Sequence, residues 1–226
     1  MSASIDVPDT LAAYDRWATH YDLDDNPLVA ATGWVLAHAP LTVAGARVVE
    51  LGCGTGRHAA PLLTAGATAY LGVDGSAGML AQAHARVADP RATWLTADLA
   101  ALPPCPGPRF DRALIVLVLE HVAAPAPLFA ALAGWLDPGA TLRILELHPA
   151  RIAAGTAAHF IDGGVEHRFA SFAHEPAALV ANLAAAGFAA TARTWCAEGE
   201  LLAAVPRLAK HAGRPIVLDV TATRAP

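Results

Sequence analysis

One segment constrains the fold of this chain more than any other. A short β-rich run, residues 46–51, leads directly into the glycine-rich sequence GCGTG, residues 52–56. Glycine lets the backbone turn tightly and approach a ligand closely. A strand followed by a glycine loop and a helix is how open α/β sheets bind ligands beside the carboxyl ends of their strands. The segment therefore predicts an α/β fold with a ligand crevice at residues 52–56.

Strands and helices alternate along most of the chain. The expected strands are residues 46–51, 68–73, 92–96, 110–117, 141–147, 188–195 and 216–223. The main expected helices are residues 9–21, 27–38, 56–64, 76–87, 127–136 and 176–186. This alternation predicts a Rossmann-like, mostly parallel seven-stranded sheet with helices on both faces. The last two strands are joined without a long crossover helix, so we expect them to form an antiparallel hairpin at the C-terminal edge.

The length of the chain suits one α/β domain, residues 1–226. Its expected parts are a helical N-terminal lid (1–40), a ligand-binding core (41–147), a substrate-side insert (148–174) and a C-terminal helix with edge strands (175–226). We expect the insert to be irregular. Asp137-Pro138-Gly139 is expected to form a turn before the fifth strand.

The composition argues against several classes of partner. The formal net charge is −5, so no overall basic field attracts nucleic acid. No apolar run approaches the roughly 18 residues of a membrane span, and the N-terminal residues lack the features of a signal peptide. The cysteines Cys53, Cys105 and Cys196 lie far apart, as is typical of a reducing compartment. We therefore expect a cytoplasmic protein with no nucleic-acid or membrane partner.

Acidic residues follow the next two expected strands. Asp74 lies 22 residues beyond Gly52, where a carboxylate can accept hydrogen bonds from ribose hydroxyls. Asp98 follows the third strand and can accept from an exocyclic amine of adenine. Arg57 occupies the sixth position of the loop, where the dinucleotide fingerprint requires glycine or alanine. The pattern indicates a nucleoside ligand that has no pyrophosphate.

The motifs VVELGCGTGRHAAPLL, LGVDGSAGML, ADLAALP and FDRALIVLVLEHV resemble, in order, those of the class I S-adenosylmethionine-dependent methyltransferases. The resemblance covers residues 46–147 most specifically and implies bound S-adenosylmethionine. It places the methionine portion on the glycine loop, the ribose on Asp74 and the adenine between Asp98 and Leu99. The implied cofactor-binding residues are Glu50, Gly52, Cys53, Gly54, Gly56, Asp74, Gly75, Met79, Asp98, Leu99 and Val116.

The downstream sequence is similar to a small-molecule branch of this family. His148-Pro149 after the fifth strand and Ala186-Gly187-Phe188 after a helix carry that likeness. It implies a small-molecule methyl acceptor, in a pocket walled by aromatic residues of the lid and insert. Those residues are Tyr14, Trp17, Tyr21, Phe160, Phe169 and Phe172. Arg151 and Arg168 either meet an acidic group of the acceptor or are solvated.

Methyl transfer by in-line displacement requires alignment of the acceptor and sometimes a base. The candidate catalytic residues are His148, His121, Tyr21, Tyr14 and His174. His148 is the preferred base because it ends the fifth strand, whereas His121 more often supports a neighbouring group. His174 can simply cap a helix, and the two tyrosines either orient the acceptor or pack. The loose spacing of the insert histidines predicts no metal site.

Two alternatives to a methyltransferase remain at this stage. A nicotinamide-dependent oxidoreductase commonly needs a catalytic lysine, and Lys210 is the only lysine of the chain. A non-catalytic protein that senses S-adenosylmethionine would carry the same motifs. Turnover of any acceptor distinguishes the enzyme from the sensor.

Overall fold

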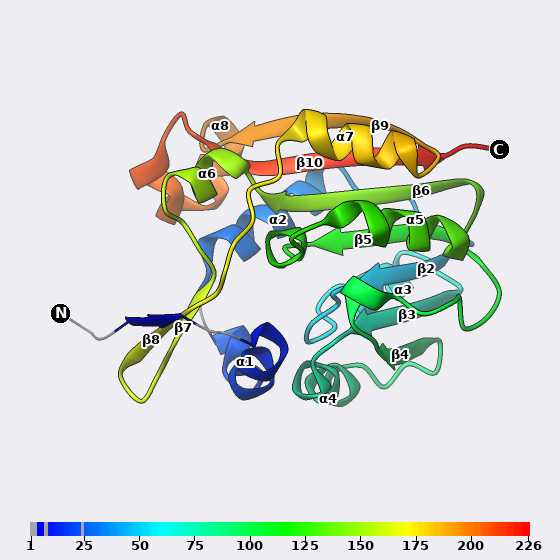
Figure 1. Ribbon diagram of the computed structural model, residues 1–226, viewed down its shortest axis with the longest axis horizontal. Coiled ribbons are helices and arrows are strands. Elements are labelled where there is room, and N and C mark those ends of the chain that lie inside the picture. Colours follow the sequence, from blue (N-terminus) through cyan, green and yellow to red (C-terminus); the bar gives the residue numbers. More distant parts are fainter. Residues whose placement is uncertain (1–3, 7–8, 24) are drawn as a thin grey trace.

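The computed structural model describes residues 4–6, 9–23 and 25–226. Residues 1–3, 7–8 and 24 of the expected lid lie outside this description. In the described part of the chain the main sheet has seven strands in the order β4-β3-β2-β5-β6-β10-β9 (Figure 1). Its strands are β2 (Arg47–Leu51), β3 (Ala69–Asp74), β4 (Ala92–Thr96), β5 (Phe110–Val116), β6 (Leu136–Leu147), β9 (Phe188–Cys196) and β10 (Pro215–Arg224). Strands β2 to β6 pair in parallel, and β10 runs antiparallel to both β6 and β9. The predicted fold class is confirmed.

Helices cover both faces of this sheet. The α-helices are α1 (Thr10–Trp17), α2 (Pro27–His38), α3 (Ala59–Thr64), α4 (Ala77–Arg86), α5 (Pro125–Trp135), α6 (Pro149–Ala153), α7 (Pro176–Ala185) and α8 (Gly199–Ala204). Short 3-10 helices are η1 (Tyr21–Leu23), η2 (Leu99–Ala101), η3 (Leu119–His121) and η4 (Pro206–His211). Helices α5 and α7 pack on one face, whereas α2, α3 and α8 pack on the other (Figure 1). Alternate residues of β5 therefore enter different cores, Ile115 on the first face and Leu114 on the second.

Polar side chains cap the starts of several helices. Asn26 accepts a hydrogen bond from the Leu28 amide at the start of α2, where Pro27 takes the first helical position. Ser76 accepts from the Met79 amide at the start of α4. The first helix is shorter than expected, because α1 ends at Trp17 and Tyr21 lies in the separate 3-10 turn η1.

The prediction that residues 148–174 are irregular is wrong. This insert contains α6 and a hairpin of β7 (His159–Asp162) and β8 (Val165–Arg168). Gly163 and Gly164 join the two strands with φ of 55° and 80°, as a two-residue turn requires. Strand β1 (Ser4–Asp6) pairs in parallel with β8 and completes a separate small sheet of described residues, in the order β1-β8-β7.

The turn predicted at Asp137-Pro138-Gly139 is an irregularity within β6. The pairing of β5 with β6 runs from Phe110 opposite Leu136 to Arg112 opposite Thr141, so extra residues of β6 bulge there. Proline and glycine are tolerated in strands at such bulges, and Gly139 takes a φ of 80°. The turn-forming residues thus produce a local kink without ending the strand.

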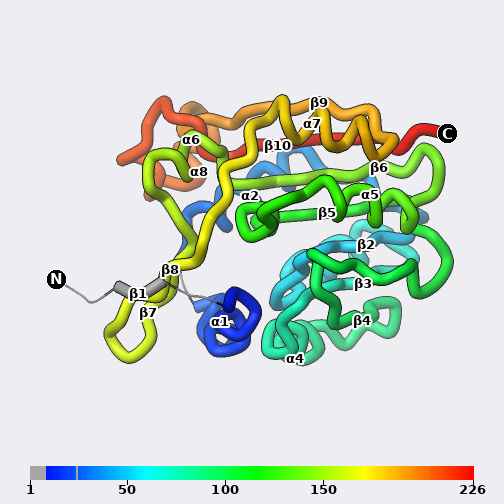
Figure 2. The backbone as a smooth tube through the Cα atoms, in the orientation of Figure 1, coloured from blue at the N-terminus to red at the C-terminus, as the bar shows by residue number. Residues whose placement is uncertain are grey.

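Helix α1 lies between the small sheet and α4 (Figure 2). On one side its residues Ala13 and Trp17 join Phe160 and Phe169 of the insert in a buried aromatic cluster. The Trp17 and Phe160 rings are stacked with centroids 5.3 Å apart. The N-terminal segment and the insert therefore form one packed unit beside the carboxyl ends of the main strands.

Candidate active site

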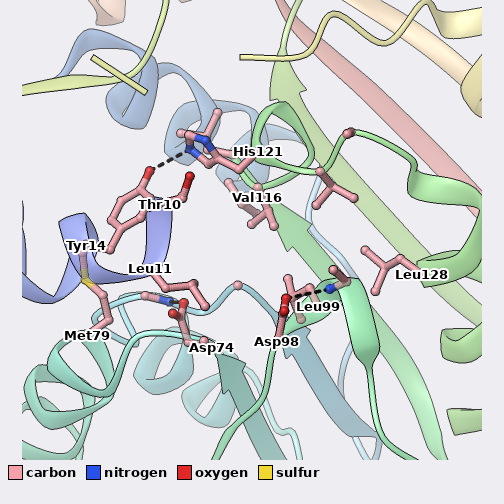
Figure 3. A pocket seen from close by; sticks show the side chains of 18 of the residues that line it. Thr10, Leu11, Tyr14, Asp74, Met79, Asp98, Leu99, Val116, His121 and Leu128 are labelled. Carbon is pink, nitrogen blue, oxygen red and sulfur yellow. Dashed lines mark hydrogen bonds between the residues drawn. The ribbon is translucent and has the colours of Figure 1, made fainter. Parts of the chain in front are cut away.

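A cavity of about 760 Å³ opens at the carboxyl ends of β2, β3, β4 and β5, and α1 closes part of its mouth (Figure 3). Most of the residues implied to bind the cofactor line it. They are Gly52, Gly54, Asp74, Gly75, Met79, Asp98, Leu99 and Val116. Four strand ends that are distant in sequence thus meet at one site, as expected for a parallel sheet.

The path of the glycine loop depends on positions that lack a side chain. Gly52 and Gly54 have φ of 69° and 52°, in the region that strains other residues. A Cβ atom on Gly52 would lie 2.3 Å from Cγ2 of Val118. A Cβ atom on Gly54 would meet nothing within 4 Å. The loop is therefore pressed against the end of β5 at Gly52, whereas Gly54 leaves room for a ligand.

The Asp74 carboxylate joins two of the loops that form the cavity. Its Oδ2 accepts a hydrogen bond from the Gly54 amide at 2.8 Å, and its Oδ1 accepts one from the Ser76 amide at 2.9 Å. Burial raises the pKa of Asp74, and these two N–H groups act in the opposite direction. Each carboxylate oxygen keeps a second lone pair, so the oriented group can still accept from ligand hydroxyls.

Asp98 takes a similar position after β4. Its Oδ1 accepts a hydrogen bond from the Ala100 amide at 2.9 Å, so Asp98 caps the start of η2. Leu99, the first residue of η2, lines the cavity. The carboxylate is held by its own turn and stays exposed. A polar acceptor beside an apolar wall suits a heteroaromatic ring with an exocyclic amine.

Tyr14 and His121 close the opposite side of the cavity. The Tyr14 hydroxyl lies 2.8 Å from Nε2 of His121 (Figure 3). Burial raises the pKa of Tyr14, so the phenol keeps its proton. Burial lowers the pKa of His121 to about 4, and a backbone contact with Ala170 partly offsets this. At neutral pH the pair is an uncharged phenol beside an uncharged imidazole.

The chain is similar to known proteins. A family model described as a methyltransferase domain matches residues 48–139, which supply most of the cavity lining. An uncharacterized methyltransferase of Emericella nidulans is 29% identical over 222 residues, which cover 81% of this chain and 77% of the relative. The crystal structure of an S-adenosylmethionine-dependent methyltransferase from Mesorhizobium loti superposes with a TM-score of 0.74 at 29% identity. That match covers 88% of this chain and all of the other.

Residues 48–139 therefore form a methyltransferase domain, and the chain has the fold of the class I S-adenosylmethionine-dependent methyltransferases. Its cofactor is S-adenosylmethionine, and the nicotinamide alternative is not supported. Other relatives are partial matches. Methyltransferase-like protein 27 of Homo sapiens is 36% identical, but the match spans 53% of this methyltransferase and 51% of the relative. Trans-aconitate 2-methyltransferase of Paracidovorax citrulli is 37% identical over 49% of this chain and 42% of its own.

The remaining residues implied to bind the cofactor lie outside the cavity of this methyltransferase. Glu50 is buried beneath the glycine loop, where it accepts from the Tyr70 hydroxyl at 2.5 Å and contacts Nδ1 of His58 at 2.7 Å. Cys53 is buried, and burial raises the pKa of its thiol. A Cβ atom on Gly56 would lie 2.7 Å from the Trp94 ring. All three support the loop from behind.

The structure separates two of the other catalytic candidates, His148 and His174, from the cavity. His148 begins α6, where its Nδ1 accepts from the Ala150 amide at 3.3 Å and its Nε2 lies 3.3 Å from Thr194 Oγ1. His174 lies behind the turn after β5, with Nε2 at 2.9 Å from the carbonyl oxygens of Leu119 and Val122. Tyr21 does line the cavity, with the Arg57 guanidinium 5.1 Å from its ring centroid.

Sequence reasoning missed the contacts by which α1 docks on the core. Asp15 Oδ1 accepts from Ser76 Oγ at 2.6 Å and from the Gly78 amide at 2.8 Å. Asp22 forms ion pairs with Arg57 and Arg86. Leu11 packs against Gly75, and a Cβ atom on Gly75 would lie 2.6 Å from Cδ2 of Leu11. These partners are at least 35 residues apart in the sequence, and no local pattern marks them.

The segment after β5 supplies a further wall, whose residues were not among the predicted cofactor-binding residues. The lining residues of this wall are Leu117, Val118, Val122, Ala123, Ala124, Pro127 and Leu128. By contrast, the insert aromatics Phe160 and Phe169 pack behind Tyr14 and do not line the cavity. Among the described residues, no helix is both long and apolar enough to cross a membrane. The same residues contain no cluster of three His, Cys, Asp or Glu side chains placed to hold a metal ion.

Proposed function

We propose that this methyltransferase transfers a methyl group from S-adenosylmethionine to a small organic acceptor. The observation that carries the proposal is the cavity of about 760 Å³, which lies under α1 and within the range of small-molecule sites. When bound, the cofactor supplies an activated methyl group. The protein has to orient the acceptor for in-line displacement and to exclude water.

The residues of the cavity fit the cofactor. Gly54 leaves open space at the loop, and Asp74 offers two oriented carboxylate oxygens for ribose hydroxyls. Asp98 and Leu99 offer a polar and an apolar contact for adenine. Met79, which is nearly fully buried at the start of α4, also lines the cavity.

On the acceptor side we assign different roles to Tyr14 and His121. His121 has a pKa lowered to about 4, so it is a weak base at neutral pH. It is better suited to hold the Tyr14 hydroxyl, which lies 2.8 Å away and faces the cavity. Tyr14 then orients the acceptor, together with Tyr21. His148 lies outside the cavity, and we do not propose it as the base.

The charges that line the cavity favour an acceptor without acidic groups. Asp9, Asp74 and Asp98 line it, and no lysine or arginine of the described residues does. Arg151 instead contacts Thr156 and His211, and Arg168 donates to the Gly155 carbonyl. A tricarboxylate such as trans-aconitate would have no cation to pair with here. We therefore propose a neutral or cationic acceptor.

Calorimetric titration with S-adenosylmethionine tests the site. We expect Asp74→Asn to weaken binding by about 1–3 kcal/mol, because a charge-assisted hydrogen-bond acceptor is lost. The matched control is Asp162→Asn, an exposed carboxylate at the β7–β8 turn, which should bind as the unchanged protein does. Equal affinities for Asp74→Asn and the unchanged protein would remove Asp74 from the site.

Mass-detected methylation of a panel of neutral, cationic and anionic metabolites tests turnover. We expect products only from neutral or cationic acceptors and a large loss of turnover in Tyr14→Phe. Binding of S-adenosylmethionine without any product across the panel would favour the non-catalytic sensor instead.

A further inference from the structure

The turn after β5, residues 117–122, supplies much of the cavity wall and carries His121. It begins with an unfavourable backbone conformation, because Leu117 has a φ of 58° although it is not glycine. Such a residue persists only where its surroundings hold it. The hydrogen bond from the Leu117 amide to the Leu145 carbonyl fixes only the start of the turn.

A buried carboxylate holds the next two residues of this turn. Glu146 of β6 is 4% exposed, and its Oε1 accepts from the Val118 amide at 2.9 Å and from the Leu119 amide at 3.0 Å. Behind the turn, His174 contacts the carbonyl oxygens of Leu119 and Val122. Two amides and two carbonyls of the turn are thus held by side chains from β6 and from the segment before α7.

We propose that Glu146 is a positioning residue of the active site: by accepting from two consecutive amides, it fixes the turn after β5 and so places His121 against Tyr14. The inference rests on the proposed function of the cavity. Glu146 does not line that cavity, so its effect on the site is carried by the turn.

The surroundings of Glu146 explain why an acceptor rather than a charge is required. Burial raises the pKa of Glu146 to about 8, while the Leu119 and Val118 amides act against this and the Glu120 carboxylate adds to it. Glu120 and His174 line the same chamber of about 10 Å³, and on α1 the Tyr14 phenol interacts with Glu146, which adds to the rise of the Tyr14 pKa. Among the described residues, Oε2 of Glu146 is buried and has no hydrogen-bond partner. The neutral acid can still accept both amide hydrogen bonds through Oε1. The side-chain carbonyl oxygen of glutamine can accept them in the same way.

Two substitutions separate these properties. Glu146→Gln keeps an acceptor for both amides, and Glu146→Leu leaves them unsatisfied in the core. Asp219→Asn is the matched control, because Asp219 is also buried in the sheet but pairs with Arg143 at 2.6 Å, away from the turn. Each variant is measured as the full chain, by circular dichroism, by calorimetric titration with S-adenosylmethionine and by amide NMR of Val118 and Leu119.

We expect Glu146→Leu to weaken binding about tenfold and to shift the amide signals of Val118 and Leu119. Glu146→Gln should recover binding to within about threefold, whereas Asp219→Asn should lower only the melting temperature. In the unchanged protein the two amide signals should titrate with Glu146, and in Glu146→Gln they should not.

Three results would overturn the proposal. A folded Glu146→Leu protein with unchanged affinity would show that the turn does not need this side chain. A glutamine variant as weak as the leucine variant would assign the effect to charge. Amide signals of Val118 and Leu119 that do not change with pH would also overturn the proposal, even if Glu146→Leu fails to fold. Failure of the unchanged protein to bind S-adenosylmethionine would instead refute the proposed function, and the amide titration would still test Glu146.

Discussion

Replacing Gly52 by alanine tests how tightly the glycine loop is pressed against β5. The substitution forces a left-handed backbone on alanine, which costs about 1–2 kcal/mol. It also places a methyl group 2.3 Å from Val118 Cγ2, and overpacking of this kind costs about 1–3 kcal/mol more. We therefore expect a loss of about 2–5 kcal/mol in the free energy of unfolding.

Gly54→Ala is the matched control. Gly54 has the same kind of backbone, but its added methyl group would meet nothing within 4 Å, so only the loss of about 1–2 kcal/mol remains. Urea denaturation at constant pH measures both variants. In the background of Val118→Ala, which removes the clashing methyl groups, Gly52→Ala should cost no more than Gly54→Ala. Equal losses for the two glycines in the unchanged background would refute the close contact.

Two further predictions concern the lid and the buried carboxylate. Trp17→Ala should destabilise the protein by about 3–5 kcal/mol in denaturation, because it empties the buried aromatic cluster between α1 and the insert; a loss below about 1 kcal/mol would mean that the cluster is not packed. Since burial raises the pKa of Glu146 from 4.5 to about 8, the folded state binds this proton more tightly than the unfolded state. The stabilising contribution of protonated Glu146 to the free energy of unfolding is full below pH 4.5 and falls as the pH rises toward 8. Glu146→Gln should remove that decline in thermal melts, and an unchanged pH profile would contradict it.

The part of the site formed by local patterns could be predicted from the sequence. Gly52, Gly54, Asp74 and Asp98 follow short apolar runs, and in a parallel sheet the carboxyl ends of such runs meet. The strand β4 was predicted at the observed residues 92–96. These features depend on spacing along the chain, which a single sequence contains.

The features that escaped prediction depend on contacts between distant residues. Asp15 binds the start of α4 across 61 residues, and Glu146 supports a turn 27 or 28 residues before it. His148 ends a strand as expected, but its ring turns toward α6 and Thr194. A strand position fixes where a residue sits, and its tertiary neighbours decide which way its side chain points.

A crystal structure of the complex with S-adenosylhomocysteine would show whether the carboxyl ends of the parallel strands hold the cofactor. We expect the ribose hydroxyls to bind the Asp74 carboxylate, the adenine to lie beside Asp98 and Leu99, and the Gly54 backbone to contact the amino-acid portion. A nucleoside bound elsewhere, or an Asp74 carboxylate that stays satisfied by the Gly54 and Ser76 amides alone, would contradict this expectation.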